Sequence, residues 1–467
     1  MTTRSEHDLL GDLDIPADAW YGVQTQRALN NFHITGVPIS HFPHFVVALA
    51  MVKAAAARAN RDLGLLPATK AEAILAACDE IIGGRLHEAF VVDLIQGGAG
   101  TSTNMNANEV IANLALEKLG QPKGAYQHLH PNDDVNMSQS TNDAYPTAVC
   151  VGLQFAAEPL IEAIASLKSA FEAKGREFAD VLKMGRTQLQ DAVPMTLGQE
   201  FEAFAVNLGE DIDRIREACA LLCEVNLGGT AIGTGINTHP DYARLAVRHL
   251  AEISGRPIVP AANLVEATSD MGAFVLFSGI LKRLAVKLSK IANDLRLLSS
   301  GPRTGFGEIH LPPMQPGSSI MPGKVNPVIP EAVNQVAYQV IGNDLAVTLA
   351  AEAGQLQLNA MEPLIVYNLL NSLKMLAGAC DMFEQRCVRG IRADREQCRR
   401  HLDRSIGVIT ALVPHIGYAN ASRIAAEALA SNSTVRELVI RDGLLSEARL
   451  DALLSPQSML APQAVAA

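Results

Sequence analysis

The chain has 467 residues, of which 48% are hydrophobic, 19% charged and only 4% aromatic. This composition excludes disordered and collagen-like classes, and the length allows a large core and roughly two to four domains. The formal net charge of -11 at pH 7 argues against nucleic acid as a partner, because a phosphate backbone requires a concentrated basic surface.

The N-terminal segment, residues 1–14, is charged from its fourth residue and has no apolar core, so the sequence predicts no secretory signal. The longest apolar runs are interrupted before the ~18 residues that a membrane span requires. Seven cysteines lie mostly in apolar helical stretches without a C-x-x-C pair, which is typical of reduced core thiols. We therefore expect a soluble, cytoplasmic protein that does not bind membranes.

The sequence offers no persuasive metal site. Cys219 and Cys223 could place two ligands on one helix face, but no histidine is near them, so core packing is the favoured interpretation. His128 and His130 have no complementary cluster either, and we expect them in a loop.

Apolar periodicity predicts a nearly all-α architecture, because strand-like alternation is scarce. Helices are expected at 42–63, 152–175, 196–223, 262–300 and 331–353, with short helices such as 446–454 near the C-terminus. Heptad spacing from Phe277 to Leu298 suggests one helix of roughly 45 to 55 Å, which needs bundle partners. Apolar flanks such as 273–280 indicate further burial by other subunits. We place domain limits near 140 and 395, giving domains 1–139, 140–395 and 396–467.

Polar clusters interrupt this helical pattern in chain order. The first, at 97–109, combines glycines, hydroxyls and asparagines before a helix expected to begin near Asn108; its donors suit a carboxylate, although such a turn can also cap its own helix. The second, at 138–147, places Ser140, Thr141 and Asn142 just before a helix. The third, at 185–196, includes Arg186, which could clamp an anion or be paired structurally.

The fourth cluster is the segment GSSIMPGKVNPVIPE at 317–331, which has the parts of a mobile lid over an anion. Gly317 permits unusual backbone angles, Ser318 and Ser319 offer hydroxyls, Lys324 adds a cation, and Pro330 suits the first turn of a helix. A surface linker would have a similar composition. A phosphate-binding P-loop is excluded, because five residues separate the glycines and valine follows the lysine.

This fourth segment resembles the shared loop of the aspartase/fumarase superfamily, whose members eliminate a group beta to a carboxylate and release fumarate. The other clusters match the superfamily in the same order, so the resemblance covers nearly the whole chain from Asp8 onward. It implies a three-domain fold with a long central helical bundle. It also implies a homotetramer in which three subunits share each active site.

The resemblance assigns roles to individual residues. Ser318 would be the base that removes the C3 proton, and Lys324 and Asn326 would hold one carboxylate. The other carboxylate, which gains charge, would be bound by Thr101, Ser140 and Thr141, with Ser319 as a further donor. Asn142 and Thr187 would contact the amino group and a carboxylate, and the remaining substrate contacts would come from Gln188 and Met321. This scheme needs no metal and no organic cofactor.

One position departs from the pattern, because Gln188 stands where fumarases and some aspartases have histidine, and glutamine cannot carry a proton. The segments 98–102, 140–147 and 351–363 resemble aspartate ammonia-lyases more than class II fumarases, which remain the alternative. The expected substrate pair is therefore L-aspartate and fumarate. A catalytically silent helical scaffold is disfavoured, since it would not need these hydroxyl clusters or Lys324.

Overall fold

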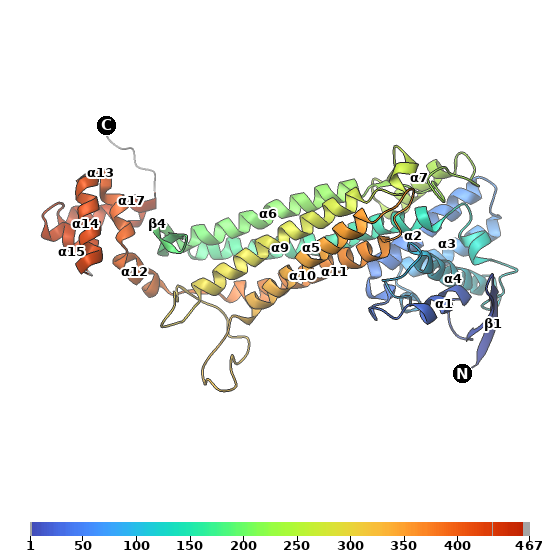
Figure 1. The fold of residues 1–467 in the computed structure, drawn as a ribbon, viewed down its shortest axis with the longest axis horizontal. Coiled ribbons are helices and arrows are strands. Elements are labelled where there is room, and N and C mark those ends of the chain that lie inside the picture. The colour runs from blue at the N-terminus through green and yellow to red at the C-terminus, as the bar shows by residue number, and fades with distance from the viewer. Residues whose placement is uncertain (1, 432, 461–467) are drawn as a thin grey trace. The chain divides into compact units, whose positions relative to one another are not determined.

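The computed structural model describes residues 2–431 and 433–460, and the chain divides into two compact units. The first unit comprises Met1–Glu162, Asp211–Ala285 and Tyr338–Ala377, and the second comprises Ala163–Glu210, Val286–Ala337 and Gly378–Ala467. The long helices contribute residues to both units: α5 (Thr141–Glu177), α6 (Leu197–Leu221), α9 (Gly272–Leu298), α10 (Val328–Glu352) and α11 (Glu362–Arg386) (Figure 1).

The first unit also contains short helices and small sheets around these long helices. Its further helices are α1 (Val23–Asn31), α2 (Pro43–Asp62), α3 (Ala68–Ile82), α4 (Thr101–Lys118), α7 (Tyr242–Ser254) and α8 (Leu264–Ala267). Its strands are β1 (Thr3–Asp8) paired antiparallel with β2 (Gly11–Pro16), and β5 (Glu224–Val225) paired parallel with β6 (Val259–Pro260).

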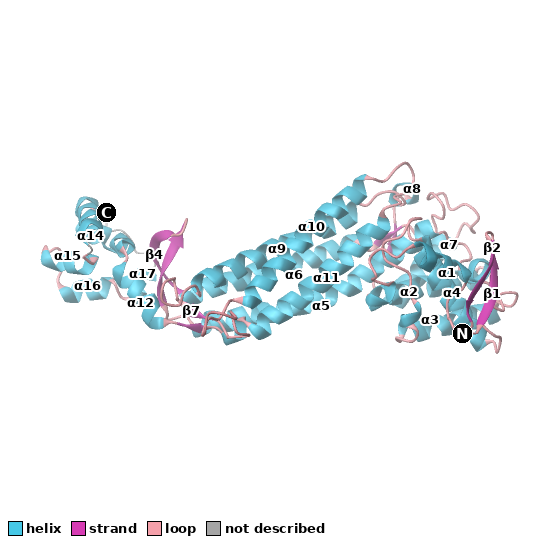
Figure 2. Cartoon of the chain, turned by 60° about the horizontal axis from the view of Figure 1, so that its bottom comes forward, coloured by secondary structure: helices cyan, strands magenta, loops and turns pink. Residues whose placement is uncertain are grey.

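The second unit has a hairpin of β3 (Leu182–Thr187) and β4 (Gln190–Thr196), and a short antiparallel pair of β7 (Ile309–His310) and β8 (Arg392–Ala393). Its further helices are α12 (Arg395–Arg404), α13 (Val413–Ile416), α14 (Tyr418–Ser431), α15 (Val435–Arg441), α16 (Glu447–Leu453) and α17 (Pro456–Leu460). Leu402, Leu412, Ile424, Val439 and Leu450 form part of an apolar core among the C-terminal helices. Figure 2 shows how small the strand content is beside the helices.

Within each unit, polar and aromatic contacts join neighbouring long helices. In the first unit, Ser278 Oγ on α9 donates to Asp344 Oδ1 on α10 at 2.8 Å. In the second unit, the ring of Phe171 on α5 lies 5.6 Å from that of Phe204 on α6 and 6.1 Å from that of Phe383 on α11. Such aromatic pairs add to area burial, so the helices pack in a specific arrangement.

The mostly helical fold class is confirmed, whereas the domain limits near 140 and 395 stay predictions. Three expected helix boundaries were wrong. The helix expected over 152–175 begins at Thr141, so Thr141 and Asn142 lie in its first turn and not before it. The helix predicted over 262–300 is interrupted between α8 and α9, where Asp270 Oδ2 accepts a hydrogen bond from Gly272 N at 3.0 Å and starts a new helix. The helix expected near Asn108 begins at Thr101, because asparagines of its first turns find buried partners elsewhere in the first unit.

The expectation that every apolar run is too short for a membrane span also needs correction. In the described part of the chain, one helix, α5, is both long enough and apolar enough to cross a membrane, judged by length and composition alone. Its apolar window is 56% buried inside the protein, however. The core helix of a large bundle must be apolar for the same reason as a membrane span, so composition does not distinguish the two.

Candidate active site

Thr101 is the first residue of α4 and follows a tight turn whose residues Gly98, Ala99 and Gly100 all have positive φ, at 90°, 53° and 90°. The side chain is exposed, and its hydroxyl donates to Gly98 O at 2.7 Å. To donate to a ligand, the hydroxyl must rotate away from this carbonyl. Thr101 N already donates to Gly98 O at 3.0 Å and Thr103 N to Gln96 Oε1 at 3.0 Å, so the hydroxyl is the donor that Thr101 can offer to an anion.

Ser140, Thr141 and Asn142 are half-buried where α5 begins. Buried Asp143 holds this turn, because its carboxylate accepts from Ser140 N at 2.9 Å and from the main chain of Gly228 at 2.9 Å. Burial raises the pKa of Asp143, while these N–H donors and Lys53 lower it. Asn142 donates through Nδ2 to Ala231 O at 2.8 Å, so the turn is tied to the segment after β5.

The first unit brings these two clusters together through α2. The Nζ of buried Lys53 donates to Asn104 Oδ1 on α4 at 2.6 Å, and to Asn136 Oδ1 and Gln139 Oε1 before α5, each at 2.9 Å. Asn104 Nδ2 in turn donates to Thr141 Oγ1 at 3.2 Å. Thr101 and the Ser140–Asn142 turn therefore rest on one polar network.

Glycine at position 100 is required for the close approach of the two clusters. A Cβ added to Gly100 would lie 2.6 Å from ring atoms of Tyr145 on α5. Real Cβ atoms do not make contacts this short, so any side chain here would push α4 and α5 apart.

In the second unit, Thr187 and Gln188 lie at the exposed tip of the β3–β4 hairpin. Thr187 pairs with Gln190, and the two residues between them, Gln188 and Leu189, have φ of 56° and 62°. Positive φ at both positions is the pattern of a type I′ turn, which normally uses asparagine and glycine. Non-glycine residues held in this region cost free energy and concentrate at functional sites.

Arg186, which the sequence left open between anion binding and structural pairing, is paired. Its Nη1 lies 2.7 Å from Oε1 of Glu308, a fully buried carboxylate that also contacts His401 Nδ1 at 2.9 Å and Lys183 Nζ at 3.0 Å. Burial raises the pKa of Glu308, but Lys183, His401 and Arg186 outweigh burial and the pKa is lowered. This cluster holds β3 at Lys183 and at Arg186, the residue before Thr187.

The segment 317–327 forms a closed loop before α10, which Figure 1 shows projecting from the adjoining helices. Gly317 N donates to Lys324 O at 2.8 Å, and Asn326 Nδ2 donates to Gly317 O at 2.8 Å. The Oγ of Ser318 accepts from Ile320 N at 3.2 Å and from Met321 N at 3.1 Å. Two main-chain donors on one hydroxyl oxygen favour its ionised form. Ser319, Met321 and Lys324 are exposed.

The structure therefore brings the predicted residues together in separate groups. Thr101, Ser140, Thr141 and Asn142 form one group in the first unit. Thr187 and Gln188 form a second group and the 317–327 loop a third, both in the second unit, and no hydrogen bond between these two groups is found among the described residues. Within residues 2–431 and 433–460, no three His, Cys, Asp or Glu side chains are arranged to hold a metal ion.

Comparisons with known proteins agree across nearly the whole chain. Residues 11–342 match the lyase family model and residues 408–461 match a fumarase C C-terminal model. An aspartate ammonia-lyase of Pseudomonas aeruginosa is 66% identical over 465 residues (99% of this chain, 98% of the relative), and one of Escherichia coli K12 is 55% identical over 460 residues (98% and 96%).

Among solved structures, the fumarate lyase:delta crystallin of Brucella melitensis bound to cobalt has a TM-score of 0.96 at 63% identity, covering 99% of this chain and 100% of that one. A class II fumarase of Schistosoma mansoni has a TM-score of 0.92 at 35% identity, covering 98% and 99%. The chain belongs to the aspartase/fumarase superfamily of lyases. Of the relatives named here, the two aspartate ammonia-lyases, at 66% and 55% identity, are more similar to this chain than the fumarase, at 35%.

For a member of this superfamily, the most prominent residue missed by the sequence analysis is Lys53. It stands among alanines and aliphatic residues in the run FVVALAMVKAAAA, where a lysine on an otherwise apolar helix was the available signal. Burial lowers the pKa of Lys53 to about 7, whereas Asp143 and Cys78 raise it. A lysine is rarely fully buried unless its donors are satisfied, and here amide oxygens satisfy them.

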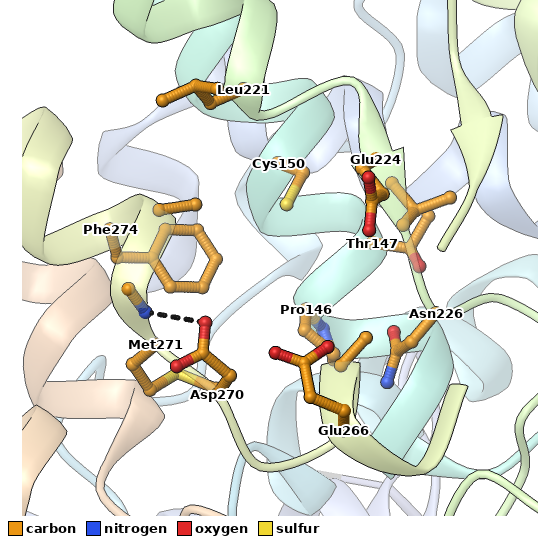
Figure 3. A pocket seen from close by; sticks show the side chains of 14 residues that line it. Pro146, Thr147, Cys150, Leu221, Glu224, Asn226, Glu266, Asp270, Met271 and Phe274 are labelled. Atoms are coloured by element: carbon orange, nitrogen blue, oxygen red, sulfur yellow. Dashed lines mark hydrogen bonds between the residues drawn. The ribbon is translucent and has the colours of Figure 1, made fainter. Parts of the chain in front are cut away.

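The first unit also holds a cavity of about 280 Å³ beside the early turns of α5 and α9, shown in Figure 3. Its wall includes the carboxylates of Glu224, Glu266 and Asp270, and none of its lining residues is among the predicted substrate contacts. Like charges repel, so this acidic wall does not suit the dicarboxylate substrates of the superfamily. The wall residue Asn226 nevertheless donates through Nδ2 to Asn142 O at 2.9 Å and supports the predicted site from behind.

Proposed function

We propose that the protein is an aspartate ammonia-lyase that reversibly eliminates ammonia from L-aspartate to give fumarate. The observation that carries this proposal is the environment of Ser318, whose Oγ accepts two main-chain N–H groups inside a closed loop. The names of the relatives at 66% and 55% identity support the same reaction. The reaction needs no metal or organic cofactor in this scheme.

In the proposed mechanism, ionised Ser318 takes the proton from C3 of bound L-aspartate. The electron pair of that C–H bond moves into the adjacent carboxylate, which becomes a doubly charged aci-carboxylate. The pair then forms the C2–C3 double bond as the C–N bond breaks and ammonia leaves. Because charge grows on one carboxylate, hydrogen-bond donors fixed around it lower the barrier. We assign these donors to Thr101, Ser140, Thr141 and Ser319.

The remaining residues orient the substrate. Exposed Lys324 supplies a positive charge and Asn326 an amide for the second carboxylate, with Met321 lining the same loop. Asn142, Thr187 and Gln188 contact the amino group and the second carboxylate. Gln188 offers a neutral hydrogen bond in place of a proton relay.

Serine must be made far more acidic than usual to act as a base. Each unit of pKa lowering requires about 1.36 kcal/mol of differential stabilisation. The N–H groups of Ile320 and Met321 supply part of it, and Lys324 and exclusion of water on loop closure supply more. Closure over substrate would deliver this stabilisation only when substrate is bound.

We further propose a homotetramer in which three subunits contribute to each active site. The exposed face of α10 supports association, because Tyr338, Ile341, Leu345 and Leu349 recur along one side of the helix with 58%, 36%, 60% and 60% of their surface in water. A contiguous apolar face of this kind marks an interface. We also propose a cytoplasmic location, as expected for an enzyme with free cysteines.

The test is to follow the ultraviolet absorbance of fumarate when purified protein is mixed with L-aspartate, and in parallel with L-malate. We expect fumarate from aspartate and little from malate; the reverse result would identify a fumarase instead. Ser318→Ala should lower kcat by about 10²- to 10⁴-fold, the usual contribution of a general base, with an unchanged melting temperature. Gln315→Ala, in the same exposed segment, is the matched control and should remain active. A Ser318→Ala variant with near-normal turnover would reject the proposed base.

A further inference from the structure

Lys53 joins three chain segments that the predicted carboxylate-binding residues depend on. It lies on α2 with only 1% of its surface exposed. Its Nζ contacts Asn104 on α4 and Asn136 and Gln139 in the segment before α5, at 2.6 to 2.9 Å. An ammonium group has three N–H donors and no acceptor, so these three amide oxygens saturate it.

The charge of Lys53 determines how these amides are turned. Each amide must present oxygen to the ammonium, which leaves its NH₂ end facing away. For Asn104, Nδ2 then points to Thr141 Oγ1 at 3.2 Å and to Asn136 Oδ1 at 3.1 Å. For Gln139, Nε2 points to the main-chain oxygens of Val135 and Met137.

This orientation has a consequence for Thr141. Since its Oγ1 accepts a hydrogen bond from Asn104, its own O–H proton is not needed for that contact and can be donated to a ligand. If Asn104 presented oxygen instead, Thr141 would donate inward and lose its capacity to stabilise an anion. Lys53 therefore determines whether the Thr141 hydroxyl donates or accepts toward the ligand, and it does so through two successive hydrogen bonds that pass through Asn104.

We propose that Lys53 is a positioning residue that keeps the Thr141 hydroxyl oriented as a donor to the substrate carboxylate, acting through Asn104. This inference rests on the proposed function for its consequence, and on the hydrogen-bond geometry of the first unit for its cause. The charged or titratable groups that act on Lys53 from other helices are Cys78 on α3 and Asp143 on α5. The remaining contacts of Nζ are neutral amides, so the network depends on the lysine for its polarity.

The first experiment is a double-mutant cycle between Lys53→Met and Thr141→Val. Lys53→Met removes the ammonium with little change of volume, and Thr141→Val removes the hydroxyl with little change of shape. We expect Lys53→Met to lower kcat by about 10- to 100-fold, as for the loss of one donor to a developing anion, with a KM change of less than about 3-fold. In the Thr141→Val background the same substitution should lower kcat by less than about 3-fold.

A second pair of variants keeps the lysine, so that a folding defect of Lys53→Met does not decide the outcome. Asn104→Asp preserves an oxygen for Lys53 but forces the other oxygen toward Thr141, which reverses the hydroxyl. Asn108→Asp is the matched control, because Asn108 Nδ2 donates to the same Asn136 Oδ1 at 3.1 Å from the same helix. We expect the effects of Asn104→Asp and Thr141→Val on kcat to be non-additive. The effects of Asn108→Asp and Thr141→Val on kcat should be additive.

Binding of 3-nitropropionate, ionised to its nitronate, is measured by calorimetry on the same variants, because this dianion carries the extra negative charge that succinate lacks. Coupled nitronate binding in a protein that does not convert L-aspartate would reject the proposed function and retain the role of Lys53. Equal losses from Lys53→Met in both backgrounds, or an Asn104→Asp variant as active as the wild type, would overturn the inference.

Discussion

At the scale of single residues, Gln188 and Leu189 form a two-residue turn in which neither residue is glycine. Both have positive φ, a conformation that costs L-residues roughly 1–2 kcal/mol each because Cβ approaches the following carbonyl oxygen. Both side chains are exposed, so packing within the chain does not explain their presence. The proposed contact of Gln188 with substrate from the tip of the hairpin would explain this conformation.

Gln188→Gly separates these two explanations. Relief of the strained conformation, offset by the greater freedom of glycine in the unfolded chain, should leave the melting temperature equal or higher. Turnover of L-aspartate should fall because a hydrogen bond to substrate is lost. Leu189→Gly relieves the same kind of strain at the neighbouring position and should retain activity. Equal activity of the two variants would remove Gln188 from the site.

At the scale of secondary-structure elements, the β3–β4 hairpin is held by a buried carboxylate, Glu308, that pairs with two cations along β3. Glu308 is fully buried between Lys183 and Arg186 of β3, with His401 of α12 beside it. A buried carboxylate of this kind is stable only while its cations remain, and the cations only while it remains. Thr187 at the end of β3 is therefore positioned through its neighbour Arg186 and through Lys183 near the start of the strand.

Glu308→Gln should lower stability at pH 7 by about 3–5 kcal/mol, because it leaves buried Lys183 and Arg186 without a shared counter-charge. The pKa of Glu308 is below the 4.5 of a glutamate side chain in water, so its contribution to stability is present above pH 4.5 and is lost as pH falls through the lower pKa of the folded protein. The melting temperature of Glu308→Gln should thus lie below that of the wild type at pH 7, and the difference between the two should narrow below about pH 4.5.

The control for this prediction is Asp180→Asn, which breaks the pair between Asp180 and Arg395 at 2.9 Å. Both partners are more than half exposed, so solvent screens the pair and the change should be small. If Glu308→Gln lowers the melting temperature no more than Asp180→Asn does, the buried cluster does not anchor the hairpin.

At the scale of the whole molecule, the predicted site residues are divided between the two compact units, and most of them are exposed or half-buried. Hydroxyls and amides that face water in one chain make no productive site alone, since water competes for every donor. The apolar face of α10 is exposed in the single chain as well. The proposed tetramer, in which subunits complete one another's active sites, would explain both features.

Intersubunit complementation tests this explanation. Thr141→Val and Ser318→Ala subunits should each be nearly inactive alone. If different subunits supply these two residues to a site, co-refolding equal amounts should restore up to about a quarter of the wild-type activity, because that fraction of randomly assembled sites receives both native residues. Mixing without refolding is the control. If co-refolded protein stays inactive although mixed tetramers form, one subunit supplies both residues.

The sequence by itself determined the helical class, the order of the polar clusters and the family, because helix periodicity is local and the motif residues lie close together in the chain. The limits of α2 and α6 followed from apolar spacing within a residue or two. The loop at 317–327 was also predictable from the sequence, since glycine and proline restrict the backbone of their own neighbours.

Only the tertiary structure revealed what holds these clusters in place. Lys53 bonds to residues 51, 83 and 86 positions away, and Glu308 pairs with residues from β3 and α12. The start of α4 at Thr101, the break before α9 and the strained turn at Gln188 likewise depend on partners or conformations that local pattern does not encode. Hydrogen bonds between distant segments form only after the helices pack, so the spacing of residues along the chain does not predict them.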